Sequence, residues 1–184
     1  QNPAFRNRLQ EIQSELATLD VKMRLAFGIR EIRLNNDFVS DKQDDLKRCH
    51  LLYYKLADLW FAYDTYLKFY TKIVGSQKNS VDWIDANVHN NYSTRAEITL
   101  ARNTTTLSFN DYYSNEARRN LFLDYLAYCK TTASNSQRRR LDQIIIKIQN
   151  QNFVLTNSEI MAITYAVRNN FVHNGETTVV PDNF

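Results

Sequence analysis

The chain has 184 residues, of which 43% are hydrophobic and 23% are charged, so it can form a globular core without disulfide bonds. Its net charge of +3 permits an anionic partner but does not require one. Only 3 Gly and 2 Pro are present, which excludes a Walker or Rossmann glycine motif and leaves few residues for tight turns. Few turns in a long chain favour a small number of long helices.

The cysteines and histidines do not form a metal-binding pattern. Cys49 and Cys129 lie 80 positions apart, and the chain has only 3 His, so no zinc site is expected. Isolated thiols are typical of a reducing compartment. The sequence has no apolar run of about 18 residues and no signal-peptide pattern. We therefore expect no metal or other cofactor, no membrane partner and a cytoplasmic location.

Residues 3–34 predict a first helix, because one apolar stripe runs along them. The stripe alternates between spacings of four and three and consists of Phe5, Leu9, Ile12, Leu16 and Leu19. Gly28 is a candidate break in this helix, and residues 35–39 are expected to form a loop.

The strongest helical pattern covers residues 41–74. Ser40 is a candidate N-cap, and Gly75 is a stop signal. Apolar residues alternate at spacings of three and four from Leu46 to Val74, and a second row beside them widens the apolar face. Such a face is typical of a helix that is buried in a bundle or that also forms an oligomer interface. We predict that this helix is the longest of the chain.

The segment after this helix has weaker patterns. Val81–Val88 and Glu97–Asn103 are candidate helices. Thr104–Phe109 is rich in threonine, which favours strands over helices, so this segment is expected to be extended or a loop.

The C-terminal part predicts three further helices. The first is expected to be capped by Ser114 and to reach about Lys130, and the second to span Ser136–Gln149. The third begins with Thr156 and Glu159, the residue pair of a capping box.

Together the patterns predict an all-α fold, a helical bundle with one long central helix. We expect a single domain over residues 1–176 and an unfolded or extended tail over residues 177–184.

The last helix ends in an unusual cluster of polar residues. Asn169 and His173 lie four positions apart and share a face. Arg168 lies five positions before His173, about 140° around the helix axis. One helix is therefore not expected to aim both side chains at one target easily, whereas two copies of the helix meeting at a two-fold axis would do so.

These residue types fit metal-free cleavage of RNA. Histidine exchanges protons near neutral pH, and arginine binds phosphate oxygens. His173 would remove the proton of the 2′-hydroxyl group, and Arg168 would stabilise the charge that develops on the phosphate. DNA has no 2′-hydroxyl group and would not be cut in this way.

The segment 168–173 reads Arg-Asn-Asn-Phe-Val-His and resembles the signature of the HEPN family. That signature is an arginine, a polar residue, three variable residues and a histidine on the last conserved helix of an α-helical bundle. The resemblance implies a metal-independent endoribonuclease that acts as a homodimer, with Arg168, Asn169 and His173 as catalytic residues at the interface. We expect RNA as substrate or ligand. For a toxin or defence effector, an antitoxin or regulatory protein is a further expected partner.

Other functions stay open at this point. Some HEPN proteins lack nuclease activity, so a non-catalytic module that binds nucleotide, RNA or a protein is the main alternative. A purely structural oligomerising bundle is a third, suggested by the wide apolar face of residues 41–74. In that case His173 would simply interact with the dipole at the helix end, and Arg168 would pair with a carboxylate.

Several other residues are candidates for RNA binding, each with a structural interpretation that we favour. The arginine runs 118–119 and 138–140 are more typical of exposed helix sides. The aromatic residues of segment 53–70 have heptad spacing and are expected in the core rather than stacked on bases. We interpret His50 as an ordinary helix residue and His89 as a loop residue.

Overall fold

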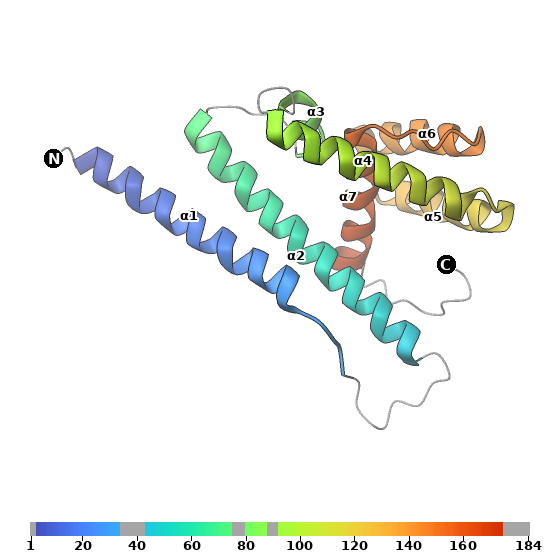
Figure 1. Ribbon diagram of the computed structural model, residues 1–184, viewed down its shortest axis with the longest axis horizontal. Coiled ribbons are helices and arrows are strands. Elements are labelled where there is room, and N and C mark those ends of the chain that lie inside the picture. The colour runs from blue at the N-terminus through green and yellow to red at the C-terminus, as the bar shows by residue number, and fades with distance from the viewer. Residues whose placement is uncertain (1–2, 34–42, 75–79, 88–91, 175–184) are drawn as a thin grey trace. The chain divides into compact units, whose positions relative to one another are not determined.

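The computed structural model describes residues 3–33, 43–74, 80–87 and 92–174, and all regular structure in these residues is helical (Figure 1). The all-α prediction is therefore confirmed. The chain divides into two compact units. The first unit contains α1 (Pro3–Gly28) and α2 (Gln43–Val74), and the second contains α3 (Trp83–Asn87), α4 (Tyr92–Tyr113), α5 (Glu116–Thr131), α6 (Asn135–Gln149) and α7 (Asn157–Asn174). That residues 1–176 form one domain stays a prediction, and the predicted tail over residues 177–184 lies outside the described residues.

Helices α1 and α2 pack as a hairpin whose facing sides are joined by polar contacts. Lys22 Nζ donates to Thr65 Oγ1 at 2.7 Å, and Lys72 Nζ donates to Glu15 Oε1 at 2.7 Å. Glu15 lies seven residues before Lys22, whereas Lys72 lies seven residues after Thr65, so the two helices run antiparallel. Because seven residues are nearly two helical turns, the two contacts lie along one line.

The longest predicted helix is confirmed. Helix α2 has 32 residues, more than any other helix in the described part of the chain, and its first turn contains Asp44 and Asp45, where the helix dipole favours anions. Ser40, Gly75 and the loop predicted at residues 35–39 lie outside the described residues. On α2, Trp60 is buried, as expected for the core, whereas Tyr53, Tyr63 and Tyr70 of the same aromatic stripe are only half-buried.

The first helix is shorter than predicted. It ends at Gly28 rather than at residue 34, and residues 29–33 have no regular structure. Glycine loses more backbone entropy on ordering than any other residue, so a helix readily ends where one occurs. The sequence predicted a possible break in the helix at Gly28, and the structure shows that the helix ends there.

The second unit is a bundle in which α6 packs against both α5 and α7. Leu141, Ile144 and Ile148 of α6 are completely buried and recur at spacings of three and four, so they form one face of the helix. The largest fully buried side chains of the described residues are Leu126, Leu141, Ile144, Ile148, Leu155 and Asn170. Asn170 is the polar member of this set, and it lies next to the predicted site.

The threonine-rich segment was predicted incorrectly. Thr104–Phe109 is neither extended nor a loop but lies inside α4, which is one continuous helix. The hydroxyl groups of Thr104 and Thr105 donate to the carbonyl oxygens of Leu100 and Ala101 at 3.0 and 2.9 Å. This bond to the preceding turn lets threonine satisfy its side chain without leaving the helix.

The helix starts follow capping chemistry, but α5 and α6 each begin one residue away from the predicted position. Helix α5 is capped by Asn115, whose side chain accepts from the Arg118 amide, and not by Ser114 as predicted. The capping box at the start of α7 is confirmed, because the Thr156 amide donates to Glu159 Oε2 at 2.7 Å and the Glu159 amide donates to Thr156 Oγ1 at 3.2 Å. The sequence therefore located these starts to within about one residue.

Asp85 of the short helix α3 holds the start of α7. Its carboxylate accepts from the amide and the hydroxyl group of Ser158 at 2.9 and 2.5 Å, and from Asn157 Nδ2 at 2.9 Å. Burial by itself raises the pKa of Asp85, but the hydrogen bonds from Ser158 and Asn157 and the positive charge of Arg102 outweigh it. The pKa of Asp85 therefore lies below its ordinary value.

The Asp85→Asn variant is expected to be less stable than the wild type by about 1–3 kcal/mol at pH 7, because charged hydrogen bonds to the start of a helix are lost. A lowered pKa in the folded state stabilises the protein above the unfolded value of about 4 and ceases to do so as the pH falls through the folded value. In denaturant unfolding, the difference in free energy of unfolding between the wild type and Asp85→Asn should therefore become smaller as the pH falls below about 4. The exposed Asp124 of α5 is the control, since Asp124→Asn should change stability little. A difference between wild type and Asp85→Asn that stays constant down to strongly acidic pH would contradict this account.

Candidate active site

The C-terminal end of α7 brings the three predicted site residues into contact within one chain. Arg168 Nη1 donates to Asn169 Oδ1 at 2.8 Å and lies 3.3 Å from His173 Nε2. Arg168 and Asn169 are half-buried, and His173 is exposed. A cation, an amide and an imidazole thus meet at the surface of the second unit.

This contact corrects one expectation drawn from the sequence. The angle between Arg168 and His173 around the helix suggested that one helix does not easily aim both side chains at one point. The guanidinium group nevertheless reaches the imidazole within a single helix. Arginine has a long, flexible side chain, so its charged end is not confined to the direction of its Cβ atom. The angular argument therefore gives no reason for a two-fold axis at this site.

In the contact between Arg168 Nη1 and His173 Nε2, the chemistry of the guanidinium group determines which atom is the donor. A guanidinium group carries only N–H donors and no acceptor, so His173 Nε2 is the acceptor in this pair. The contact is a hydrogen bond only when Nε2 is the ring nitrogen without a proton. The two hydrogen atoms of Arg168 Nη1 therefore suffice for its two acceptors, Asn169 Oδ1 and His173 Nε2.

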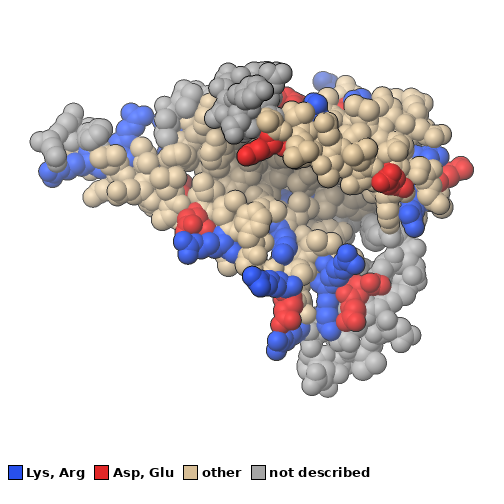
Figure 2. Space-filling view, viewed as in Figure 1, with Lys and Arg blue, Asp and Glu red and all other residues tan. Residues whose placement is uncertain are grey.

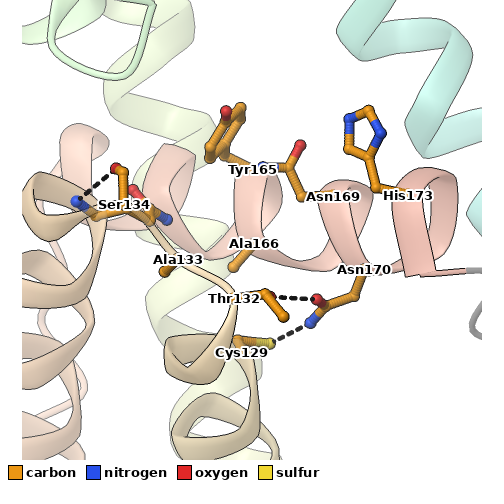
Figure 3. Close-up of a pocket in the computed structure, with 10 residues that line it drawn as sticks. Cys129, Thr132, Ala133, Ser134, Tyr165, Ala166, Asn169, Asn170 and His173 are labelled. Atoms are coloured by element: carbon orange, nitrogen blue, oxygen red, sulfur yellow. Dashed lines mark hydrogen bonds between the residues drawn. The ribbon is translucent and has the colours of Figure 1, made fainter.

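A pocket of about 350 Å³ lies beside these residues (Figure 3). Its lining residues are Cys129, Thr132, Ala133, Ser134, Gln137, Tyr165, Ala166, Asn169, Asn170 and His173. Tyr165, Asn169 and His173 project from the same side of α7, as Figure 3 shows, because each lies four positions from the next. The other lining residues come from α7, from the end of α5, from the turn that leads into α6 and from the first turn of α6.

The two adjacent asparagines have different roles. Both line the pocket, but Asn169 accepts a hydrogen bond from Arg168, whereas the side chain of the buried Asn170 turns towards the end of α5, as Figure 3 shows. Its Nδ2 atom donates to Cys129 Sγ at 2.8 Å, and its Oδ1 atom accepts from Thr132 Oγ1 at 3.5 Å. Neighbouring residues on a helix point about 100° apart, which is enough to separate a surface position from a core position.

A second contact fixes the other wall of the pocket. Gln137 of α6 is buried, and its Nε2 atom donates to the carbonyl oxygen of Ala162 on α7 at 2.7 Å. Ser134, the N-cap of α6, accepts from the Gln137 amide at 3.4 Å. Helices α6 and α7 are therefore held in register directly beneath the pocket.

Sequence reasoning missed most of the pocket. Tyr165 could have been predicted from the sequence, because this residue continues the four-residue spacing of Asn169 and His173 towards the start of the helix. Thr132 and Ser134 could not, since they lie more than thirty positions away and reach the pocket only through the packing of α5 and α6 on α7.

The arginine run on α6 makes contacts within the chain. Arg138 Nε donates to the carbonyl oxygen of Lys130 at 3.2 Å, at the end of α5. Arg140 forms two hydrogen bonds with the carboxylate of Asp82, at 2.6 and 2.5 Å. These arginines join neighbouring segments, which fits the structural interpretation of the run better than an open RNA-binding surface.

The arginine run at the start of α5 behaves similarly. Arg119 Nη1 donates to the carbonyl oxygen of Tyr113 at 3.1 Å, and the Arg118 guanidinium group lies 4.5 Å from the centre of the Tyr112 ring. On the face drawn in Figure 2, Lys and Arg side chains are interspersed with Asp and Glu side chains. Charge alone therefore does not single out a nucleic-acid surface on that face.

Metals, membranes and relatives give no further indication of function. The described residues contain no group of His, Cys, Asp and Glu side chains suited to holding a metal ion. In the same part of the chain, no helix combines the length and the hydrophobicity needed to cross a bilayer. Comparisons with protein-family models, with curated proteins and with solved structures found no match to this chain. The functional assignment therefore depends on the geometry of the site itself.

Proposed function

We propose that the protein is a metal-independent endoribonuclease of the HEPN type, with Arg168, Asn169 and His173 as its catalytic residues. The observation that carries this proposal is the 3.3 Å separation of Arg168 Nη1 and His173 Nε2 beside the pocket on α7. A fixed cation next to an imidazole is the pair of groups that metal-free RNA cleavage requires, one for the phosphate and one for a proton.

The resting contact suggests how the substrate activates the site. A phosphate oxygen is a stronger acceptor for a guanidinium group than a neutral imidazole nitrogen is. When the phosphate binds, Arg168 turns from His173 to the phosphate, and the lone pair of His173 Nε2 becomes free. Nε2 then takes the proton of the 2′-hydroxyl group, and the 2′ oxygen attacks the adjacent phosphorus atom. Asn169 orients the phosphate or the ribose by hydrogen bonding.

The reaction is completed by a second proton transfer. The bond between phosphorus and the 5′ oxygen breaks, and the leaving oxygen takes up a proton. The products are a 2′,3′-cyclic phosphate and a free 5′-hydroxyl group. We propose that a protonated His173 of a second copy provides this proton in a homodimer. The exposure of His173 at the end of α7 is compatible with a site shared in this way.

The proposal is tested by incubating wild-type protein with varied single-stranded RNAs in the presence of a chelator. We expect cleavage, products that end in 2′,3′-cyclic phosphate, and no cleavage of the same sequences made with 2′-deoxyribose. Products with a 3′-hydroxyl group, or activity that chelator abolishes, would contradict the mechanism. If no RNA is cut but RNA or nucleotide binds, the protein is a binding module and not a nuclease.

A further inference from the structure

A buried amide in the wall of the pocket has one polar atom without a partner in the chain. Gln137 of α6 is 5% exposed, lines the pocket and donates from Nε2 to the carbonyl oxygen of Ala162 at 2.7 Å. A carbonyl oxygen only accepts, so this contact fixes the orientation of the amide and leaves Oε1 as an acceptor. No group in the described part of the chain donates to Oε1. Since polar atoms of buried side chains are normally hydrogen-bonded, a ligand that donates to Oε1 would complete the set.

Thr132, at the end of α5, presents a second acceptor to the same pocket (Figure 3). The Nδ2 atom of Asn170 donates to Cys129 Sγ, so the Oδ1 atom of this amide is the one that meets Thr132. Because Oδ1 only accepts, the Thr132 hydroxyl group donates its single hydrogen atom to it, at 3.5 Å. The lone pairs of Thr132 Oγ1 are left for a ligand. Gln137 Oε1 and Thr132 Oγ1 therefore both call for a molecule with N–H or O–H donors.

The rest of the lining suits a flat ring. Tyr165 provides an aromatic side chain, and Ala133 and Ala166 are small and leave space between the polar groups. The volume of about 350 Å³ is at the lower end of the range for small-molecule sites. Every lining residue belongs to α5, α6, α7 or the turn between α5 and α6, so the second unit forms the pocket by itself.

The proposed catalytic residues lie further along α7 in the same pocket. Asn169 and His173 line it together with Gln137. Asn169 lies seven residues after Ala162, to which Gln137 donates, and this is about 10 Å along the helix. One nucleotide has about this length from its phosphate to the far edge of its base. The base of a nucleotide whose phosphate is bound by Arg168 can therefore reach Gln137.

We propose that the pocket binds the base of the nucleotide that provides the 2′-hydroxyl group, and that it selects adenine or cytosine through their exocyclic amino group. The inference rests on the proposed ribonuclease function, because it starts from a phosphate at Arg168. The amino group supplies donors for Gln137 Oε1 and Thr132 Oγ1, and the ring stacks on Tyr165. Uracil and guanine carry a carbonyl oxygen at the corresponding position, where acceptor would meet acceptor.

The first test measures the binding of nucleoside 3′-monophosphates to the full chain by calorimetry and requires no cleavage. Cytidine 3′-monophosphate should bind about 10-fold more tightly than uridine 3′-monophosphate, because uracil leaves a buried acceptor without a donor. Adenosine and inosine 3′-monophosphates make the same exchange of amino for carbonyl group in a purine. Equal affinities within both pairs, a preference for the carbonyl bases, or no binding of any of the four at millimolar concentration would overturn the proposal.

The second test uses variants of the two acceptors. Thr132→Val removes the hydroxyl group and should reduce the preference for cytidine over uridine several-fold. Thr131→Val is the matched control, since Thr131 is exposed, is not part of the lining and donates to the carbonyl oxygen of Tyr128. It should bind all four nucleotides as the wild type does. Gln137→Met, with folding checked by circular dichroism, should lose the preference altogether. If both Thr132→Val and a folded Gln137→Met protein keep the full preference, the proposed recognition is wrong.

The two proposals fail in different ways. If cytidine or adenosine 3′-monophosphate binds preferentially but no RNA is cut, the base site stands and the ribonuclease proposal fails. If RNA is cut equally after all four bases and the four nucleotides bind equally, the base site fails and the ribonuclease proposal stands.

Discussion

The His173→Ala variant is expected to cleave RNA about 10²–10⁴-fold more slowly than the wild type, which is the usual contribution of a positioned general acid or base. Its imidazole is exposed at the end of α7, so removing it should leave the fold intact. Initial rates on one single-stranded RNA, with folding checked by circular dichroism, give the measurement. His50 of α2 provides a matched control, and His50→Ala should retain the wild-type rate. A folded His173→Ala protein that cuts as fast as the wild type would show that the site has been assigned to the wrong residue.

Arg168→Ala belongs to the same experiment and should lose about 10²–10³ in rate, by analogy with removing one charge-stabilising donor. Arg168→Lys keeps the charge but has no planar fork of N–H donors, so it should recover only part of the activity. Full recovery by lysine would mean that charge alone matters and that the geometry of the guanidinium group does not.

Replacing Ile148 by alanine should lower the free energy of unfolding by about 2–5 kcal/mol, the cost of removing a large buried side chain and leaving a cavity. Ile148 is 0% exposed, whereas Ile146, two positions earlier on α6, is 56% exposed. Ile146→Ala makes the same chemical change on the solvent side and should alter stability by less than about 0.5 kcal/mol. Denaturant unfolding of the two variants and the wild type measures both effects. Equal losses would mean that α6 does not present the face to the core that its spacing predicts.

The sequence predicted the helices where local chemistry alone determines them. The alternating spacings on α2 and α6 and the capping box of Thr156 and Glu159 are signals contained within a few turns. The prediction failed for Thr104–Phe109, because an average preference of threonine for strands says nothing about hydroxyl groups that bond to the preceding turn. Leu9 and Leu16 of the predicted apolar stripe on α1 are exposed, because spacing shows which residues share a side of a helix but not which side meets the neighbouring helix.

The sequence predicted part of the candidate site, namely which residues lie close together, but not their contacts or the pocket beside them. Arg168, Asn169 and His173 lie within six residues of one another on one helix, so their proximity follows from sequence. Their mutual hydrogen bonding does not, because it depends on the rotamer of a long arginine side chain. The pocket beside them depends on the packing of three helices and has no local signal except the position of Tyr165.

The contacts beneath the pocket have a consequence for how a ligand would be received. Gln137 ties α6 to the backbone of α7, and Asn170 ties the end of α5 to the same helix. The helices around the pocket are therefore held together through the buried side chains of Gln137, Asn170 and Cys129. Binding to a preorganised cavity loses little free energy to the ordering of side chains. Affinity at this pocket should consequently follow the shape and chemistry of the molecule that enters it.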